Sequence, residues 1–198
     1  MNNPLLNHLP KDAYPLVLEL LNKYPHTLKI VNQRSSKHGD FRKTKEGKYQ
    51  ITINNNLNQY QFLLTLIHEV AHLVTHLNFK RVQPHGIEWK MTFQHLMLPF
   101  VNPSIYPMEI LPHLANYLKN PKASTDSDVH LSLALKSFNQ KSDKNFIFEI
   151  PFGSDFTFKN RTFRMGTKRR TRYECLELHS NKTYLFNQNV EVKMIVTN

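Results

Sequence analysis

The feature that most constrains this chain is a long segment from Gln59 to Leu77, in which apolar residues recur with the period of an α-helix. They occupy one broad face and are Phe62, Leu63, Leu66, Ile67, Val70, Leu73 and Val74. Three consecutive asparagines at 54–56 interrupt the pattern just before this segment. The sequence therefore predicts a long amphipathic helix here, more strongly than any other element.

Shorter elements surround this helix. Residues 11–24 have leucines near helical spacing and predict an amphipathic helix. Residues 27–33 and 48–54 predict strands, and the basic stretch between them predicts a hairpin loop or a sheet edge. A second helix is expected to begin near Gly86 and to end before Pro99.

The pattern changes towards the end of the chain. A short helix is expected within 110–118, residues 119–128 are polar and rich in helix breakers, and 129–138 predict one more short helix. From Asn145 onward, aromatic and β-branched residues alternate with polar ones. The expected strands lie within 146–150, 155–160, 161–166, 171–178, 182–187 and 190–196. They predict a small antiparallel sheet or barrel.

The predicted fold class is therefore α+β. We expect a mixed domain of helices with a small sheet at 1–120, followed by a linker with a short helix at 121–144. A small antiparallel all-β domain is expected at 145–198.

The composition is that of a folded, strongly basic protein. Of its 198 residues, 40% are hydrophobic and 21% are charged, which is ordinary for a globular domain. Its 26 Lys and Arg against 15 Asp and Glu give a net charge of +11. That surplus favours polyanionic partners, nucleic acid before acidic membrane surfaces. A basic protein with no such partner is the alternative.

Cysteine content and hydropathy limit the classes of protein further. The single cysteine, Cys175, excludes a disulfide framework within the chain and a cysteine-rich zinc module. The first residues lack the charged and then apolar pattern of a signal peptide. No apolar run approaches the roughly 20 residues of a membrane helix. We therefore expect a cytoplasmic protein that does not enter a membrane.

The predicted helix contains the motif HEVAH, in which His68 and His72 lie four residues apart. Side chains at this spacing lie one turn apart on one face, so their imidazoles can bind one zinc ion at about 2.0–2.1 Å. Glu69 is rotated by roughly 100° about the helix axis, where its carboxylate can reach a water bound to the metal. Two histidines that merely form hydrogen bonds within a helix are the alternative. Burying Glu69 without a charge or metal to engage it would be costly, however.

A catalytic zinc site needs a third protein ligand, and three residues are candidates. His76 lies about 12 Å from His68 along a straight helix, which makes it a poor third ligand. Glu88 could serve as an acidic ligand. His85 follows a loop that can return to the open side of the helix, and Gly86 after it frees the backbone for a close approach.

HEVAHL followed by PHGIEWK resembles the SprT-like zinc metallopeptidases. Their bacterial members and the eukaryotic Spartan proteases share HExxH and a later HGxxW or HGxxF element. The predicted strand, loop and strand at 27–54 also resemble the N-terminal part of that family. The similarity spans about residues 10–120, and the two histidine elements are its most specific part.

The resemblance implies a zincin-like fold for the first domain and a peptidase activity on protein or peptide substrates. It implies one Zn²⁺ ion held by His68, His72 and His85. By the same resemblance Glu69 is the general base, and Trp89 anchors the following helix in the core.

The end of the chain departs from the family, many of whose members carry a C-terminal zinc ribbon with two Cys-x-x-Cys pairs. Cys175 and His179 could supply only two of the four ligands of a structural zinc. We therefore interpret the last domain as a degenerate, metal-free relative of the ribbon, with Cys175 a buried free thiol. The residues expected to form its core are Phe146, Phe148, Phe156, Phe158, Phe163, Tyr173, Tyr184 and Phe186.

This last domain also carries seven basic residues and no acidic one between positions 159 and 172. They are Lys159, Arg161, Arg164, Lys168, Arg169, Arg170 and Arg172. With Phe163 among them as a stacking platform, the run predicts binding of single-stranded or structured DNA. A solvated hairpin with an ordinary basic face is the alternative. The stretch Arg34–Arg42 is a second, weaker basic patch that could equally line the substrate groove.

Three functions are compatible with these patterns. The first is a zinc-dependent endopeptidase, a cytoplasmic monomer that acts on proteins, including those bound or crosslinked to DNA. The second is a nucleic-acid-binding factor with a structural or weakly active zinc site, which leaves the presence of Glu69 unexplained. The third is a metal-dependent hydrolase of a non-peptide amide, which uses the same chemistry.

Overall fold

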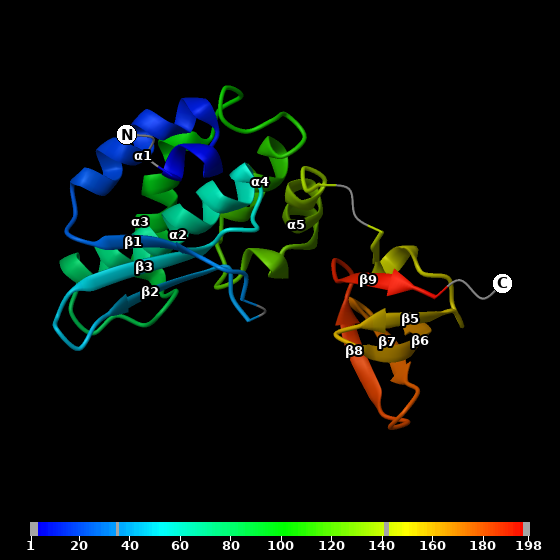
Figure 1. Cartoon of the computed structure of the whole chain (residues 1–198). Helices are drawn as coiled ribbons and strands as arrows, with labels where there is room; N and C mark the ends of the chain where they lie inside the picture. The colour runs from blue at the N-terminus through cyan, green and yellow to red at the C-terminus, as the bar shows by residue number, and fades with distance from the viewer. Residues whose placement is uncertain (1–3, 35, 141–142, 196–198) are drawn as a thin grey trace. The chain divides into compact units, whose positions relative to one another are not determined.

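The computed structural model describes residues 4–34, 36–140 and 143–195. The chain forms two compact units, Met1–Asn139 and Gln140–Asn198. The first has helices and a small mixed sheet, and the second has an antiparallel sheet (Figure 1). The predicted α+β class is therefore confirmed. Ser35 of the basic patch, residues 141–142 of the predicted linker and Val196 of the last predicted strand lie outside the described residues.

The sheet of the first unit has three strands, β1 (Thr27–Val31), β2 (Gly39–Lys43) and β3 (Tyr49–Asn54), in the order β1-β3-β2. β1 pairs with β3 in parallel, and β2 pairs with β3 antiparallel. The alternative of a hairpin loop between the two predicted strands is therefore wrong, because parallel neighbours cannot be joined by a tight turn. The sheet-edge alternative is correct, since β2 forms the edge beside β3.

The predicted central helix is α2 (Gln59–Asn78). It begins at Asn58, whose side-chain oxygen accepts hydrogen bonds from the backbone N–H groups of Tyr60 and Gln61 at 3.1 and 3.0 Å. Its apolar residues other than Leu77 are buried in one continuous core or pack against it, and the helix contacts β2, β3 and α3. α2 is thus enclosed on most of its surface rather than along a single stripe.

Four further helices complete the first unit: α1 (Tyr14–Asn22), α3 (Ile87–Met97), α4 (Leu111–Leu118) and α5 (Val129–Lys136). Short 3₁₀ turns lie at Pro4–His8, Lys11–Ala13, Leu98–Phe100 and Thr125–Ser127. α5, within the segment set apart as a linker, places Leu131 and Leu135 in the core of this unit. In the described part of the chain, no helix is long and apolar enough to cross a membrane.

The second unit is built on one six-stranded antiparallel sheet in the order β4-β9-β5-β6-β7-β8. The strands are β4 (Asn145–Phe146), β5 (Asp155–Phe158), β6 (Arg161–Lys168), β7 (Arg172–Glu177), β8 (Thr183–Asn187) and β9 (Glu191–Met194). A bulge between Met165 and Lys168 shifts the register of β6 against β7. The short strands and their turns follow the predicted pattern closely.

The core of this sheet differs from the prediction at one end. Phe156, Phe163 and Phe186 are buried, and Phe158, Tyr173 and Tyr184 pack against them. The prediction is wrong for Phe148, which is 42% exposed and stacks on half-buried Phe146. The predicted strand here is instead a 3₁₀ turn, Ile147–Glu149. Because residues three apart eclipse in such a turn, Ile147 and Ile150 enter the core together.

Replacing Leu66 by alanine should destabilise the first unit by about 2–5 kcal/mol, because the side chain is fully buried and leaves a cavity. Leu77→Ala, at a site 39% exposed on the same helix, is the matched control and should cost far less. Urea unfolding followed by the fluorescence of Trp89 measures both, since this single tryptophan lies in the first unit. Equal losses in the two variants would contradict the burial described.

Candidate metal centre

His68 and His72 project from the same face of α2, one turn apart, as their spacing requires. Their Nε2 atoms are 3.3 Å apart, and His68 is only 9% exposed. Since the rest of α2 is fixed by the core, packing holds both rings in place.

His85 lies in the turn that leads into α3, and its Nε2 atom is 3.1 Å from that of His68 and 3.0 Å from that of His72. His85 itself has a φ of 59°, a left-handed conformation uncommon for a residue with a side chain. Gly86 has an ordinary φ of −68° at the start of α3. The expectation that Gly86 supplies the backbone freedom is therefore wrong. It supplies space, because a Cβ there would lie 3.0 Å from the carbonyl oxygen of Gln83.

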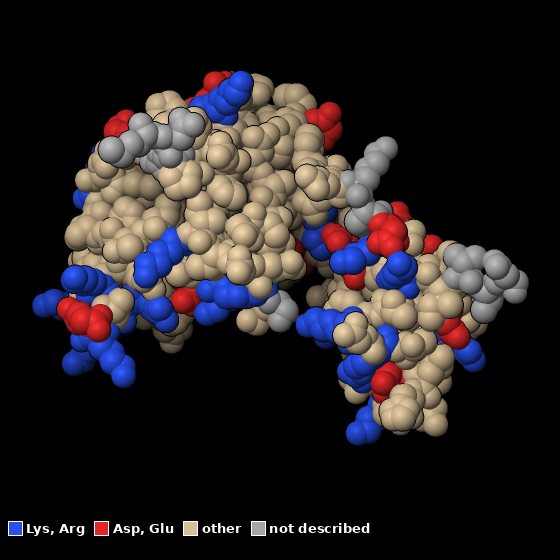
Figure 2. All heavy atoms as spheres, viewed as in Figure 1, with Lys and Arg blue, Asp and Glu red and all other residues tan. Residues whose placement is uncertain are grey.

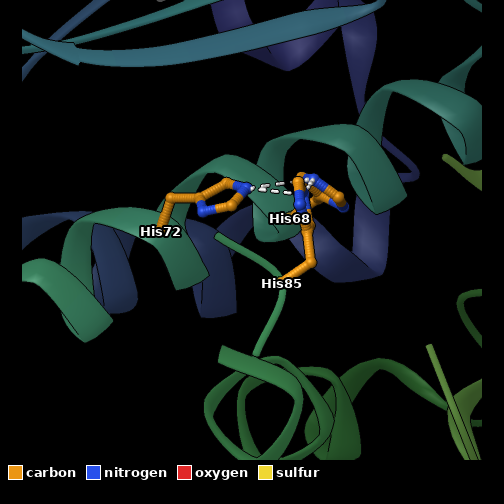
Figure 3. Close-up of side chains that lie close together, drawn as sticks. All are labelled: His68, His72 and His85. Atoms are coloured by element: carbon orange, nitrogen blue, oxygen red, sulfur yellow. Dashed lines mark hydrogen bonds between the residues drawn. The ribbon is translucent and has the colours of Figure 1, made fainter. Parts of the chain in front are cut away.

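The three Nε2 atoms face one another across one small space (Figure 3). Hydrogen bonds cannot satisfy all three contacts, because one ring nitrogen cannot donate and accept at once. A tetrahedral zinc ion with Zn–N bonds of about 2.0–2.1 Å places its ligand nitrogens about 3.3–3.4 Å apart. The observed separations of 3.0 to 3.3 Å are close to that value. The three-histidine cluster could therefore hold one metal ion.

The three imidazoles of the cluster are in the protonation state that binds a metal ion. Burial, with the nearby histidine rings, lowers the pKa of His68 to about 3 and that of His72 to about 4. Burial also lowers the pKa of His85. The rings are neutral at pH 7, which is the form in which imidazole binds a metal ion.

Trp89 supports the three imidazoles from α3. It is 1% exposed, and its ring centroid lies 4.6 Å from that of His68, 5.3 Å from that of His72 and 4.6 Å from that of His85. It also stacks on Phe93 at 5.0 Å. The expected anchoring role is thus confirmed, and the same ring limits how far the three imidazoles can tilt.

Glu69 is buried against the first residues of β2. A Cβ at Gly39 would lie only 2.7 Å from its Oε1 atom, so a side chain there would displace the carboxylate. The backbone N–H of Phe41 donates a hydrogen bond to the carboxylate. Burial, and then Asp40, raise the pKa of Glu69 to about 8. A dication at the histidine cluster would oppose this rise, since an opposite charge favours the carboxylate.

Two cavities meet at Glu69. One, of about 230 Å³, lies between Arg34 with residues 36–39 and residues 123–126, and reaches Thr65. The other, of about 440 Å³, extends past the histidine cluster to Phe41 and His76. Both are lined by Gly39, His68, Glu69 and Ala123, so the carboxylate and the first histidine lie where the two join.

The other histidine and acidic candidates lie outside the cluster. His76 is exposed near the end of α2, with its ring 5.9 Å from that of Phe41 and 5.5 Å from that of Tyr49. Glu88 lies in the first turn of α3. Among the described residues, only His68, His72 and His85 form a group of potential ligands close enough to share an ion.

The basic run of the second unit is partly neutralised. Three of its arginines form ion pairs, Arg161 with Glu177, Arg164 with Asp155 and Arg169 with Glu174. Phe163, expected to be a stacking platform, is 1% exposed, so that expectation is wrong. The side chain of Arg161 lies over its ring instead, at 5.2 Å.

Cys175 is a free thiol, fully buried on β7. Its Sγ atom lies 3.8 Å from the Sδ atom of Met165. Burial raises the pKa of the thiol to about 11, so it is protonated at pH 7.

Sequence reasoning missed the surroundings of Glu69. Gly39 was seen only as part of a basic stretch, and its role depends on how β2 lies against α2. The Nε2 atom of His38 lies 2.9 Å from Oδ2 of Asp126, which joins segments 88 residues apart. No local sequence pattern predicts a contact between segments so far apart. A glycine at the first position of a strand is the one signal that could have singled out Gly39.

Comparison with known proteins identifies a family for the first unit. Residues 19–106 match the SprT-like family. A search of curated proteins and a search of solved structures each found no match.

Removing one of the three imidazoles should abolish stoichiometric zinc binding. We expect His85→Ala to weaken zinc affinity by at least about 100-fold, since even residues that only support a ligand change it by 10–100-fold. His76→Ala, at a histidine outside the cluster, is the control and should bind one ion normally. Competition with a chromogenic chelator measures both, and unchanged affinity in His85→Ala would contradict the assignment.

Proposed function

Because the chain carries a SprT-like family domain at residues 19–106, we propose that it is a zinc-dependent endopeptidase. The observation that carries the proposal is the convergence of three imidazole nitrogens beside the buried carboxylate of Glu69. The cavities on both sides of this carboxylate support an enzyme that cuts within a chain rather than one that removes terminal residues.

The roles follow from the geometry. His68, His72 and His85 would hold the ion, and zinc at this position supplies Lewis-acid activation of water and of the substrate carbonyl. Glu69 accepts the proton of the attacking water at a carboxylate oxygen and can pass it to the leaving amine. Gly39 and the backbone N–H of Phe41 orient that carboxylate. Trp89 and the core exclude bulk water from the buried side of the site.

A non-peptide amide would be hydrolysed by the same groups. The two joined cavities favour a polypeptide, because a small amide would need only one of them.

Glu69→Gln should retain zinc and lose about 10²–10⁴-fold in cleavage rate, because the amide keeps the size of the side chain but cannot accept a proton. The measurement is release of fluorescence from labelled, denatured casein, with metal content determined on the same samples. Glu88→Gln, the same substitution outside the histidine cluster, is the matched control and should stay active. Normal cleavage by Glu69→Gln would sink the mechanism.

The second part of the proposal is that the chain binds DNA and encounters its protein substrates there. The observation that supports DNA binding is the positive charge of the chain. Residues 1–139 contain 15 Lys and Arg against 9 Asp and Glu, and residues 140–198 contain 11 against 6. Figure 2 shows Lys and Arg side chains gathered at the turn between β2 and β3. The exposed basic residues there are Arg42, Lys43, Lys45 and Lys48, and the acidic Glu46 is exposed among them. A DNA-binding factor without peptidase activity has the same charge, but it has no use for Glu69.

We expect the chain to bind a single-stranded oligonucleotide with an affinity that falls as salt is raised. Replacing exposed Lys159 and Arg170 by glutamine should lower the log–log salt slope by about 1.4, or about 0.7 for each lost phosphate contact. Lys23→Gln is the control, because Lys23 is already paired with Glu19. Fluorescence anisotropy measures all three proteins. Binding that ignores salt, or no binding, would remove DNA from the proposal.

A further inference from the structure

The smaller cavity beside Glu69 has the dimensions and lining of a subsite for one polar side chain. Its volume of about 230 Å³ is below the range of pockets that hold drug-sized molecules. Its walls are Arg34 with residues 36–39 and residues 123–126, and none of the described residues that line it has a large apolar side chain. A polar group of the substrate next to the scissile bond would therefore find hydrogen-bonding partners there rather than an apolar surface.

Most charged groups around this cavity are already compensated. Lys37 lies 2.7 Å from Oδ1 of Asp40. Asp126 lies 2.9 Å from Nε2 of His38 and accepts a hydrogen bond from the hydroxyl of Ser132 at 3.1 Å. These pairs also fix the two walls, because His38 and Asp126 come from opposite sides of the cavity.

Arg34 differs from these groups. Its Nε donates to Oδ1 of Asn54 at 2.9 Å, its Nη1 to Oγ1 of Thr52 at 3.0 Å and its Nη2 to the backbone oxygen of Thr52 at 3.3 Å. All three acceptors are neutral, and among the described residues Arg34 forms no ion pair. The contacts hold the half-buried guanidinium still while leaving its charge uncompensated by a bonded carboxylate.

The guanidinium also has donors to spare. Of its five N–H groups three are used, which leaves one on Nη1 and one on Nη2. Each of these N–H groups can donate a charge-assisted hydrogen bond to a carboxylate oxygen. A lysine or arginine of the substrate would instead meet this fixed positive charge, and the one carboxylate opposite, Asp126, is already engaged.

We propose that Arg34 is a specificity-determining residue, which binds the carboxylate of a substrate Asp or Glu side chain next to the scissile bond. The substrates are then polypeptides with an acidic residue at that position. This inference rests on the proposed function, because it concerns the same site.

The test uses quenched fluorescent peptides in which a single Glu, or Gln in its place, is moved through the positions around the cleavage site. For the zinc-loaded wild type, one position should show a kcat/KM at least about tenfold higher with Glu than with Gln. Arg34→Gln should abolish this ratio, and Arg34→Glu should prefer Lys at the same position. The ratio within one protein cancels any general effect of the substitution on Glu69 or on stability.

Arg42→Gln is the matched control. Arg42 also donates only to a neutral acceptor, Oε1 of Gln50, but it lines neither cavity beside Glu69. It should keep the wild-type ratio. A ratio near one in the wild type, or an equal loss in Arg42→Gln, overturns the proposal.

Binding of the same peptides, measured by anisotropy on the zinc-loaded chain, separates this inference from the proposed function. Binding that prefers Glu and depends on Arg34, without turnover, would support the subsite and count against the peptidase. Turnover without any preference for Glu would support the peptidase and count against the subsite. If Arg34→Gln weakens binding of a single-stranded oligonucleotide but leaves the Glu to Gln ratio unchanged, Arg34 contacts phosphate and the proposal fails.

Discussion

His68 and Glu69 lie in the middle of a helix whose buried residues are mostly apolar, and burial of two ionisable groups there has to be compensated. His68 is compensated by losing its charge and by facing two further imidazoles. Glu69 is compensated only in part, by the N–H of Phe41 and by Arg34 and Lys37, because burial and Asp40 still raise its pKa to about 8. The turn that carries His85 and the edge strand β2 supply the groups that face His68 and Glu69. Trp89 supports the three imidazoles from the side of α3. In this unit the same contacts therefore pack the core and position the residues of the site.

What could be predicted from the sequence was local. The period of α2 and the spacing of its histidines depend only on helix geometry, so the helix, its ligand pair and the α+β class follow from them. The parallel pairing of β1 with β3 and the contact between His38 and Asp126 depend on segments far apart in the chain. At His85 the pattern predicted the correct position of the turn but the wrong cause. The positive φ belongs to the histidine and not to Gly86.

The same distinction explains the basic run of the second unit. Counting charges along residues 159–172 treats the stretch as isolated, whereas in a sheet each residue faces partners on the neighbouring strands. Asp155, Glu174 and Glu177 lie outside the run and approach it only through that pairing. A cationic stretch on a strand is therefore a weaker indicator of nucleic-acid binding than the same stretch in a tail. The exposed turn between β2 and β3 is less affected, because its side chains extend past the sheet.

The residues that match the SprT-like family end at 106, but the structure that encloses their chemistry does not. Leu114, Tyr117, Leu131 and Leu135 belong to the same core as α2, and residues 123–126 form one wall beside Glu69. A fragment cut at 106 would keep every ligand and the carboxylate, yet it would open the core to water. A minimal fragment that keeps this site intact, or a transplant of the site into another scaffold, has to extend to the end of the first compact unit. In this chain the segment that matches the family is shorter than the smallest folded unit that keeps the site buried.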